Sequence, residues 1–242
     1  MTGSDVHTSA AQAVLDGYAD GTPYERLARS FLEFDRVAGD DPVLLLVEAA
    51  ASTTGQGFAG VRATVERFRD AFVGPGRVRS FDELGALDPQ DDALVEAVGA
   101  QRNRHVLCAA AAVLADRSEG DDLEALRSWA AEADVYRYEV DPIGAISGVG
   151  PASFQHLRLL AGVDTVKPDP QVTALVEAVA EELEPSPLDA AEPLRAVASC
   201  EWLTIETTYR RIELDQLAWV TFADERDLEA AAEAGLIRDV TG

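Results

Sequence analysis

Lysine is almost missing from this chain: of its 20 basic residues, 19 are arginine and only Lys167 is lysine. Against them stand 44 acidic residues, which give a formal net charge of -24. Dense carboxylates keep a surface hydrated, and molar salt screens their mutual repulsion. We therefore interpret the chain as a halophilic, cytoplasmic protein. Such a surface excludes a polyanionic partner except where acidic residues are locally missing.

Cysteine is also scarce, since Cys108 and Cys200 are the two in the chain and lie far apart in the sequence. Two cysteines cannot form a disulfide framework or a four-cysteine zinc or iron–sulfur site. We expect two buried thiols, no metal site and no iron–sulfur cluster.

Long hydrophobic runs are absent as well. No stretch approaches the roughly 20 apolar residues of a membrane-spanning helix, and the first residues lack the pattern of a signal peptide. Hydrophobic residues nevertheless make up 47% of the chain and are spread along it, which argues against disorder. We expect a folded monomer without a membrane partner.

Alternation of apolar and polar residues, the pattern of strands, is nearly absent. Apolar residues recur instead at helical spacing, as in Val61, Val65, Phe68 and Phe72. Short segments rich in Gly, Pro and Asp interrupt this pattern, for example "GDDP" and "EPSP". The sequence predicts an all-α fold of short helices joined by tight loops.

Three segments contain no Asp or Glu: residues 49–65, 97–115 and 142–163. Burial explains their apolar positions but not the basic residues among them. These are Arg62, Arg102, Arg104, His105, His156 and Arg158. We expect part of the three segments to form one non-acidic face that a polyanion can approach.

The third segment contains Gly148, Val149 and Gly150, followed by Pro151. Two glycines around a hydrophobic residue allow a tight turn, and proline favours the first turn of the next helix. Free amides at a helix N-terminus bind phosphate. An ordinary turn between helices has the same pattern, so the motif alone leaves both interpretations open.

A second motif, "KPDPQV", follows at residues 167–172. Asp169 precedes Pro170 and an apolar-periodic stretch, which predicts an N-cap followed by proline at the first helical position. Asp169 is then either a capping residue alone or a rigidly held carboxylate whose free oxygen faces a groove.

Together these motifs carry a family resemblance. The segment "DPIGAISGVGPASFQHLRLLAGVDTVKPDPQV" resembles the signature of the helix-hairpin-helix (HhH-GPD) base-excision DNA glycosylases, a "PGVGxKTA"-like hairpin followed by an aspartate at a later helix start. Three more segments are similar to parts of that family: "VEAAASTTGQGFAGVRATVERF", "VGAQRNRHVLCAAAAVLA" and "RRIELDQLAWV". The resemblance covers about residues 40–222. It implies one unit, 1–242, of two interlocked helical lobes around a cleft, with a helix-hairpin-helix at 143–161.

The function implied by the resemblance is a monofunctional DNA glycosylase that hydrolyses the N-glycosidic bond of a damaged or mispaired base in double-stranded DNA. Asp169 matches the catalytic carboxylate, which stabilises positive charge on the sugar. Gly148, Val149 and Gly150 match the phosphate-binding hairpin, with Gln56, Arg102 and Arg104 as backbone or wedge contacts. The resemblance requires no cofactor, although the hairpin is compatible with a monovalent cation.

The chain also departs from the family. Ala152 replaces the lysine that attacks the sugar in bifunctional members, so a Schiff base from that position is excluded. Pro170 and Gln171 replace the usual residues after the aspartate, and the cysteines of the iron–sulfur branch are missing. A catalytically inactive DNA-binding or structural relative therefore stays open, as does an acidic helical adaptor for protein partners.

Lys167 lies two residues from the candidate catalytic aspartate. Lysine offers a compact ammonium group that arginine does not. Lys167 is thus a candidate to hold a phosphate, to favour the charged form of Asp169, or to serve as a nucleophile in place of Ala152. Its survival on a loop by chance is an equally open interpretation.

Overall fold

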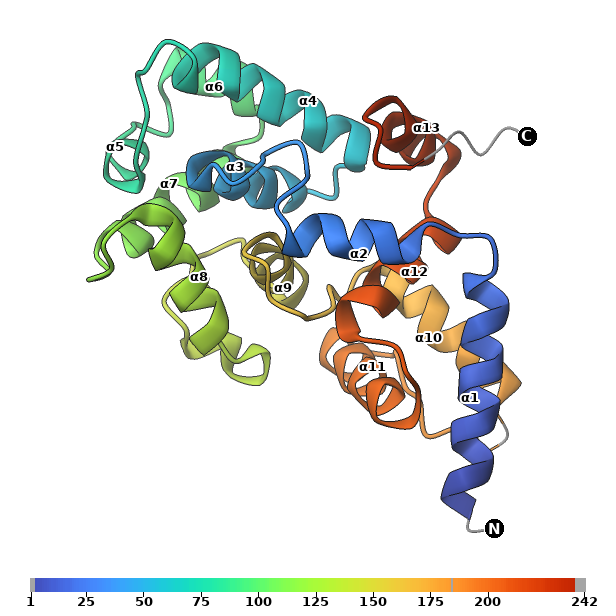
Figure 1. Ribbon diagram of the computed structural model, residues 1–242. Helices are drawn as coiled ribbons and strands as arrows, with labels where there is room; N and C mark the ends of the chain where they lie inside the picture. The colour runs from blue at the N-terminus through green and yellow to red at the C-terminus, as the bar shows by residue number, and fades with distance from the viewer. Residues whose placement is uncertain (1–2, 184, 238–242) are drawn as a thin grey trace.

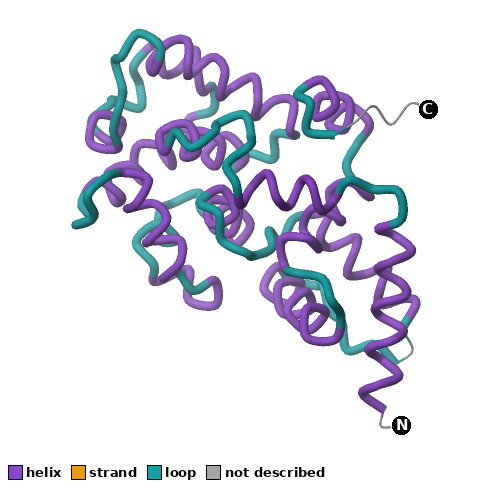
Figure 2. The backbone as a smooth tube through the Cα atoms, in the orientation of Figure 1, coloured by secondary structure: helices purple, strands orange, loops and turns teal. Residues whose placement is uncertain are grey.

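The computed structural model describes residues 3–183 and 185–237, and over these residues Figures 1 and 2 show helices and loops without a strand. The predicted all-α class is confirmed. The helices are α1 (Gly3–Ala19), α2 (Tyr24–Leu32), α3 (Pro42–Ser52), α4 (Phe58–Phe68), the π-helix η1 (Arg69–Val73), α5 (Phe81–Gly85), α6 (Asp92–Val98), α7 (Gln101–Ala115), α8 (Asp122–Glu132), the 3-10 helix η2 (Val135–Val140), α9 (Pro151–Leu160), α10 (Pro170–Glu182), α11 (Pro193–Glu206), α12 (Arg211–Phe222) and α13 (Glu225–Glu233).

Local sequence explains where many of these helices begin. An Asp or Ser side chain accepts a first-turn backbone N–H at the start of α3, α5, α6, α8, α10 and α13. Proline occupies an early position of α3, α9, α10 and α11, where its missing N–H leaves no helical hydrogen bond unmade. Some breaks in the apolar pattern, such as "GDDP" before α3, are therefore helix starts.

The helices pack in two groups (Figure 1). One group contains α3 to α9, and the other contains α1, α10, α11 and α12, so that the N-terminal helix packs with helices from the C-terminal part of the chain. Helix α2 packs on α12 and reaches α9, while α13 packs on α4. A continuous cluster of buried side chains extends through both groups, so they share one hydrophobic core.

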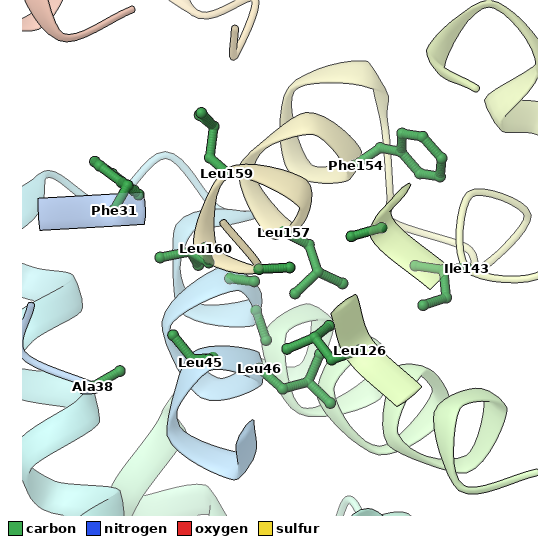
Figure 3. Close-up of a cluster of buried hydrophobic side chains, with 14 of the residues drawn as sticks. Phe31, Ala38, Leu45, Leu46, Leu126, Ile143, Phe154, Leu157, Leu159 and Leu160 are labelled. Carbon is green, nitrogen blue, oxygen red and sulfur yellow. The ribbon is translucent and has the colours of Figure 1, made fainter. Parts of the chain in front are cut away.

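Helix α3 lies at the centre of the first group, and its residues 43–51 are all buried. It contacts α4, α7 and α9, the helices of the three segments without acidic residues. Figure 3 shows Leu45 and Leu46 of α3 beside Leu157 and Leu160 of α9. A helix that is buried all round should be wholly apolar. Glu48 within it is thus an exception that needs a reason.

The segment expected to form a helix-hairpin-helix, 143–161, contains one α-helix, α9, and the expectation of a preceding helix was wrong. Residues 142–148 form turns around Asp141 instead. Asp141 Oδ1 accepts the Ile143 N–H at 2.8 Å and the Gly144 N–H at 3.2 Å. The Ala145 N–H donates to the Asp141 carbonyl at 2.8 Å, so Asp141 caps a single helical turn that does not continue as a helix.

Both cysteines are buried, as predicted, and no described helix is long and apolar enough to cross a membrane. Burial raises the pKa of the Cys108 thiol to about 11. Neither thiol is therefore an activated nucleophile.

Candidate active site

A cavity of about 560 Å³ lies where the two groups of helices meet. Its wall is built from α2, α3, α4, α9, α12, the loop before α10 and the loop before α13. The apolar part of the wall includes Leu27, Phe31, Phe58, Val61, Leu159 and Trp219. Phe58 and Trp219 meet edge to face, with their ring centroids 6.0 Å apart. Of the predicted site residues, Gln56, Arg102, Gly150, Lys167 and Asp169 all line this cavity.

Asp169 caps α10, as its position before Pro170 predicts. Its Oδ1 accepts the backbone N–H groups of Gln171 and Val172, each at 3.1 Å. Its Oδ2 lies 3.4 Å from Lys167 Nζ and takes no part in the cap. Because the side chain is only 16% exposed, the cap and the burial hold this carboxylate in one orientation at the cavity wall.

A second carboxyl group, that of Asp215, fixes the loop that carries Lys167 and Asp169. Asp215 on α12 is 7% exposed, and its Oδ1 accepts the Lys167 backbone N–H at 2.6 Å. Its Oδ2 accepts the Gln216 Nε2–H at 2.7 Å. Burial, and next the nearby charge of Asp169, raise the pKa of Asp215 to about 7. The loop is therefore anchored by a group whose charge changes near neutral pH.

The glycine motif contributes less to the cavity than predicted. Gly150 lines it, whereas Val149 packs against the core and donates its N–H to the Ile146 carbonyl at 2.9 Å, so this amide is not available to a phosphate. Gly148 has a φ of +103°, a left-handed conformation that favours glycine. Its carbonyl accepts hydrogen bonds from Arg102 Nε and Nη2, at 3.1 and 2.7 Å. Gly148 and Val149 are thus structural parts of the turn.

The start of α9 is the part of the motif that stays open. Its N-cap is Gly150, which has no side chain to bond the first-turn amides. Gly150, Pro151, Ala152 and Ser153 all line the cavity. An uncapped helix N-terminus carries partial positive charge and favours an anion.

The two predicted arginine contacts differ. Arg102 is exposed at the cavity rim, as a DNA contact would need to be, and donates to the Gly148 carbonyl. Arg104 is 6% exposed, and its guanidinium donates to the Pro89 carbonyl at 2.6 Å and to the Gly99 carbonyl. Its assignment as a DNA contact was wrong, because its hydrogen bonds serve to join α7 to neighbouring loops.

Several cavity residues were missed by sequence reasoning. Arg36 and Glu48 form a buried ion pair in its wall, with Nη2 and Oε1 2.9 Å apart. His156 Nδ1 lies 2.8 Å from Ser52 Oγ. Burial, with the nearby charges of Lys167 and Arg36, holds the pKa of His156 well below its usual value, so the imidazole is neutral. A glutamate inside the apolar run "PVLLLVEAAAS" was the available signal for the first pair.

One acidic side chain of α13 closes the rim. The Asp227 carboxylate accepts the Ala59 N–H at 3.0 Å and thereby caps α4, whose own N-cap, Gly57, has no side chain. A small apolar cluster of Leu27, Ala231 and Ile237 holds α13 in place. The N-terminus of α4 is therefore already occupied, whereas that of α9 has no side-chain cap and lines the cavity.

No family model, curated protein or solved structure matches the chain. Within the described residues, no group of three or more His, Cys, Asp or Glu side chains is placed to hold a metal ion. The relation to the helix-hairpin-helix glycosylases thus rests on the sequence motifs and stays a prediction.

Proposed function

We propose that this protein is a monofunctional DNA glycosylase, which removes a damaged or mispaired base extruded from double-stranded DNA. One observation supports this most: the cavity brings a rigidly held carboxylate, Asp169, next to the only lysine and the uncapped start of α9, beside aromatic walls. A base can enter such a cavity only after it leaves the duplex, which such enzymes achieve by rotating the nucleotide outward.

The carboxylate fits the chemistry of the N-glycosidic bond. As the bond between the base nitrogen and the sugar carbon breaks, positive charge develops on the sugar, and Asp169 Oδ2 stabilises that charge. The water oxygen then bonds to the sugar carbon. One water proton moves to the departing base, and Asp169 can orient the water for this step. The two amide bonds to Oδ1 keep the carboxylate in place during the reaction.

The approach of DNA is assigned to the segments without acidic residues. These meet through the contacts of α3 with α4, α7 and α9, and they place Gln56, Arg102 and Gly150 at one cavity. A backbone phosphate can accept hydrogen bonds from the first-turn amides of α9, with Arg102 beside it. In molar salt the rest of this acidic surface stays unfavourable for DNA.

The direct test is base release from a panel of lesion-bearing duplexes at molar KCl, with binding to undamaged duplex measured in parallel. We expect release of at least one modified or mispaired base and no strand cleavage. DNA binding without release from any duplex would favour an inactive DNA-binding relative. If neither binding nor release occurs, an acidic adaptor for protein partners becomes the better interpretation.

Gly150 provides a test of the DNA contact. Its φ is −124° and a methyl group there would meet no atom within 4 Å, so the fold itself does not require glycine. We expect Gly150→Ala to melt like the wild type but to bind duplex DNA about tenfold more weakly, because the methyl group keeps the phosphate from the amides. Gly148→Ala is the control for strain, since at a φ of +103° it should lower the melting temperature. Unchanged affinity of Gly150→Ala would remove the α9 start from the DNA interface.

Lys167 is expected to act by its charge. Its Nζ lies 3.4 Å from Asp169 Oδ2, and an ammonium in an ion pair is not a nucleophile. Borohydride added during turnover should therefore trap no covalent adduct, and Lys167→Arg should retain base release to within about tenfold because it keeps the charge. A trapped adduct that disappears in Lys167→Arg would show instead that the lysine is a relocated nucleophile.

A further inference from the structure

The buried pair of Arg36 and Glu48 has features that stability does not explain. Glu48 lies in the middle of α3, and the two side chains are only 9% and 4% exposed. The Arg36 guanidinium also lies over the Phe31 ring, 3.8 Å from its centroid. Removing both charges from water costs free energy that one ion pair repays only when the remaining polar atoms are also satisfied.

They are not all satisfied. Among the described residues, Glu48 Oε2 and Arg36 Nε are buried and have no hydrogen-bond partner. An orphaned oxygen on a charged group is especially unfavourable, since neither water nor protein replaces its lost hydration. Both residues line the cavity, and a bound molecule can supply the missing partner once the covered Glu48 carboxylate turns toward it. The oxygen is an acceptor, and the partner it needs is an N–H or O–H group.

The other polar groups near this wall are already engaged. His156 and Ser52 are bonded to each other, and the Asp215 oxygens accept from Lys167 and Gln216. Asp169 Oδ1 is used by the cap of α10 and its Oδ2 faces Lys167. Of Glu48, Asp169 and Asp215, only Glu48 thus has a buried oxygen without a partner.

We propose that Glu48 selects the base: its Oε2 accepts a hydrogen bond from the amino group of a bound nucleobase, with Oε1 held by Arg36. The substrate class is then a base with an exocyclic amino group. This inference rests on the proposed function, in that the cavity is taken to receive a base. A site with a buried acceptor strongly rejects ligands that lack the donor, because the acceptor then stays unpaired.

Matched free bases test this without any DNA. In each of three pairs, the first compound carries an exocyclic amino group and the second does not. The pairs are adenine and 6-methylpurine, 2-aminopurine and purine, and cytosine and 4-methylpyrimidin-2-one. Binding of each is measured by calorimetry or NMR titration at molar KCl. We expect the amino member of at least one pair to bind roughly ten- to a hundredfold more tightly, the effect of one hydrogen bond to a charged group. Equal binding within every pair, or no binding of any of the six compounds, overturns the inference.

Glu48→Gln identifies the residue responsible. The amide oxygen of the glutamine stays with Arg36, which puts an NH2 donor in the place of Oε2. The preference for the amino member should therefore vanish or reverse, while circular dichroism shows a helical protein. A preference that persists unchanged in folded Glu48→Gln contradicts the role of Glu48. If the variant does not fold, the matched pairs on the wild type still decide whether the cavity selects amino groups.

The outcome is separable from that of the proposed function. Preference within the pairs but no release from any duplex would support the base site and refute the glycosylase. Base release from duplexes without a preference within the pairs would support the glycosylase and refute the role of Glu48. Asp121→Asn, a change at the N-cap of α8 outside the cavity wall, should bind the free bases as the wild type does.

Discussion

Base release should fall by about a thousandfold or more in Asp169→Asn, the size of effect seen when one preorganised electrostatic group is removed from a transition state. Asparagine is as good an N-cap as aspartate, and its oxygen can still accept the Gln171 and Val172 N–H groups. The fold and DNA binding should therefore be retained. What is lost is the negative charge on Oδ2, which is the part that the sugar cation requires.

Single-turnover base release, duplex affinity and melting temperature, all at molar KCl, measure the three properties separately. Asp121→Asn is a matched control, because Asp121 caps α8 by accepting the Glu124 N–H at 2.8 Å and does not line the cavity. It should change none of the three. A wild-type rate of release in Asp169→Asn would refute the glycosylase mechanism, since no step would then depend on the carboxylate.

The features predicted well from the sequence depend on neighbours along the chain. Helical periodicity, proline at a helix start and an acidic N-cap act within one or two turns, so the all-α class and the cap at Asp169 were both correct. The closeness of Lys167 to Asp169 follows from the same short loop. In each case the sequence separation is small, and local geometry leaves few alternatives.

The features that were missed depend on contacts between distant segments. The cap of α4 comes from Asp227, 168 residues away from Ala59, and no local pattern indicates it. Arg104 was assigned to DNA because of its charge, but the carbonyls of Pro89 and Gly99 surround it in the fold. In both cases a polar group is bonded by a partner that the local sequence does not indicate.

The free energy of unfolding should depend strongly on pH through the buried carboxyl group of Asp215. Burial and Asp169 raise its pKa from 3.8 to about 7, so the folded protein holds this proton more tightly than the unfolded chain does. The stabilisation that this proton provides is therefore complete below about pH 4. It decreases as the pH rises and is lost above about pH 7. A pKa change of this size corresponds to roughly 4 kcal/mol of unfolding free energy.

Asp215→Asn isolates this contribution. Asparagine has the shape of a protonated carboxyl group, can still accept the Lys167 N–H, and does not titrate. Urea unfolding is measured at pH 5 and pH 8 in molar KCl. From pH 5 to pH 8, the unfolding free energy of the variant should rise by several kcal/mol relative to that of the wild type. Comparing the two proteins at each pH removes the effect of the many other carboxylates, which titrate in both. Parallel pH profiles would mean that Asp215 is ionised in the fold without cost, which would contradict the prediction.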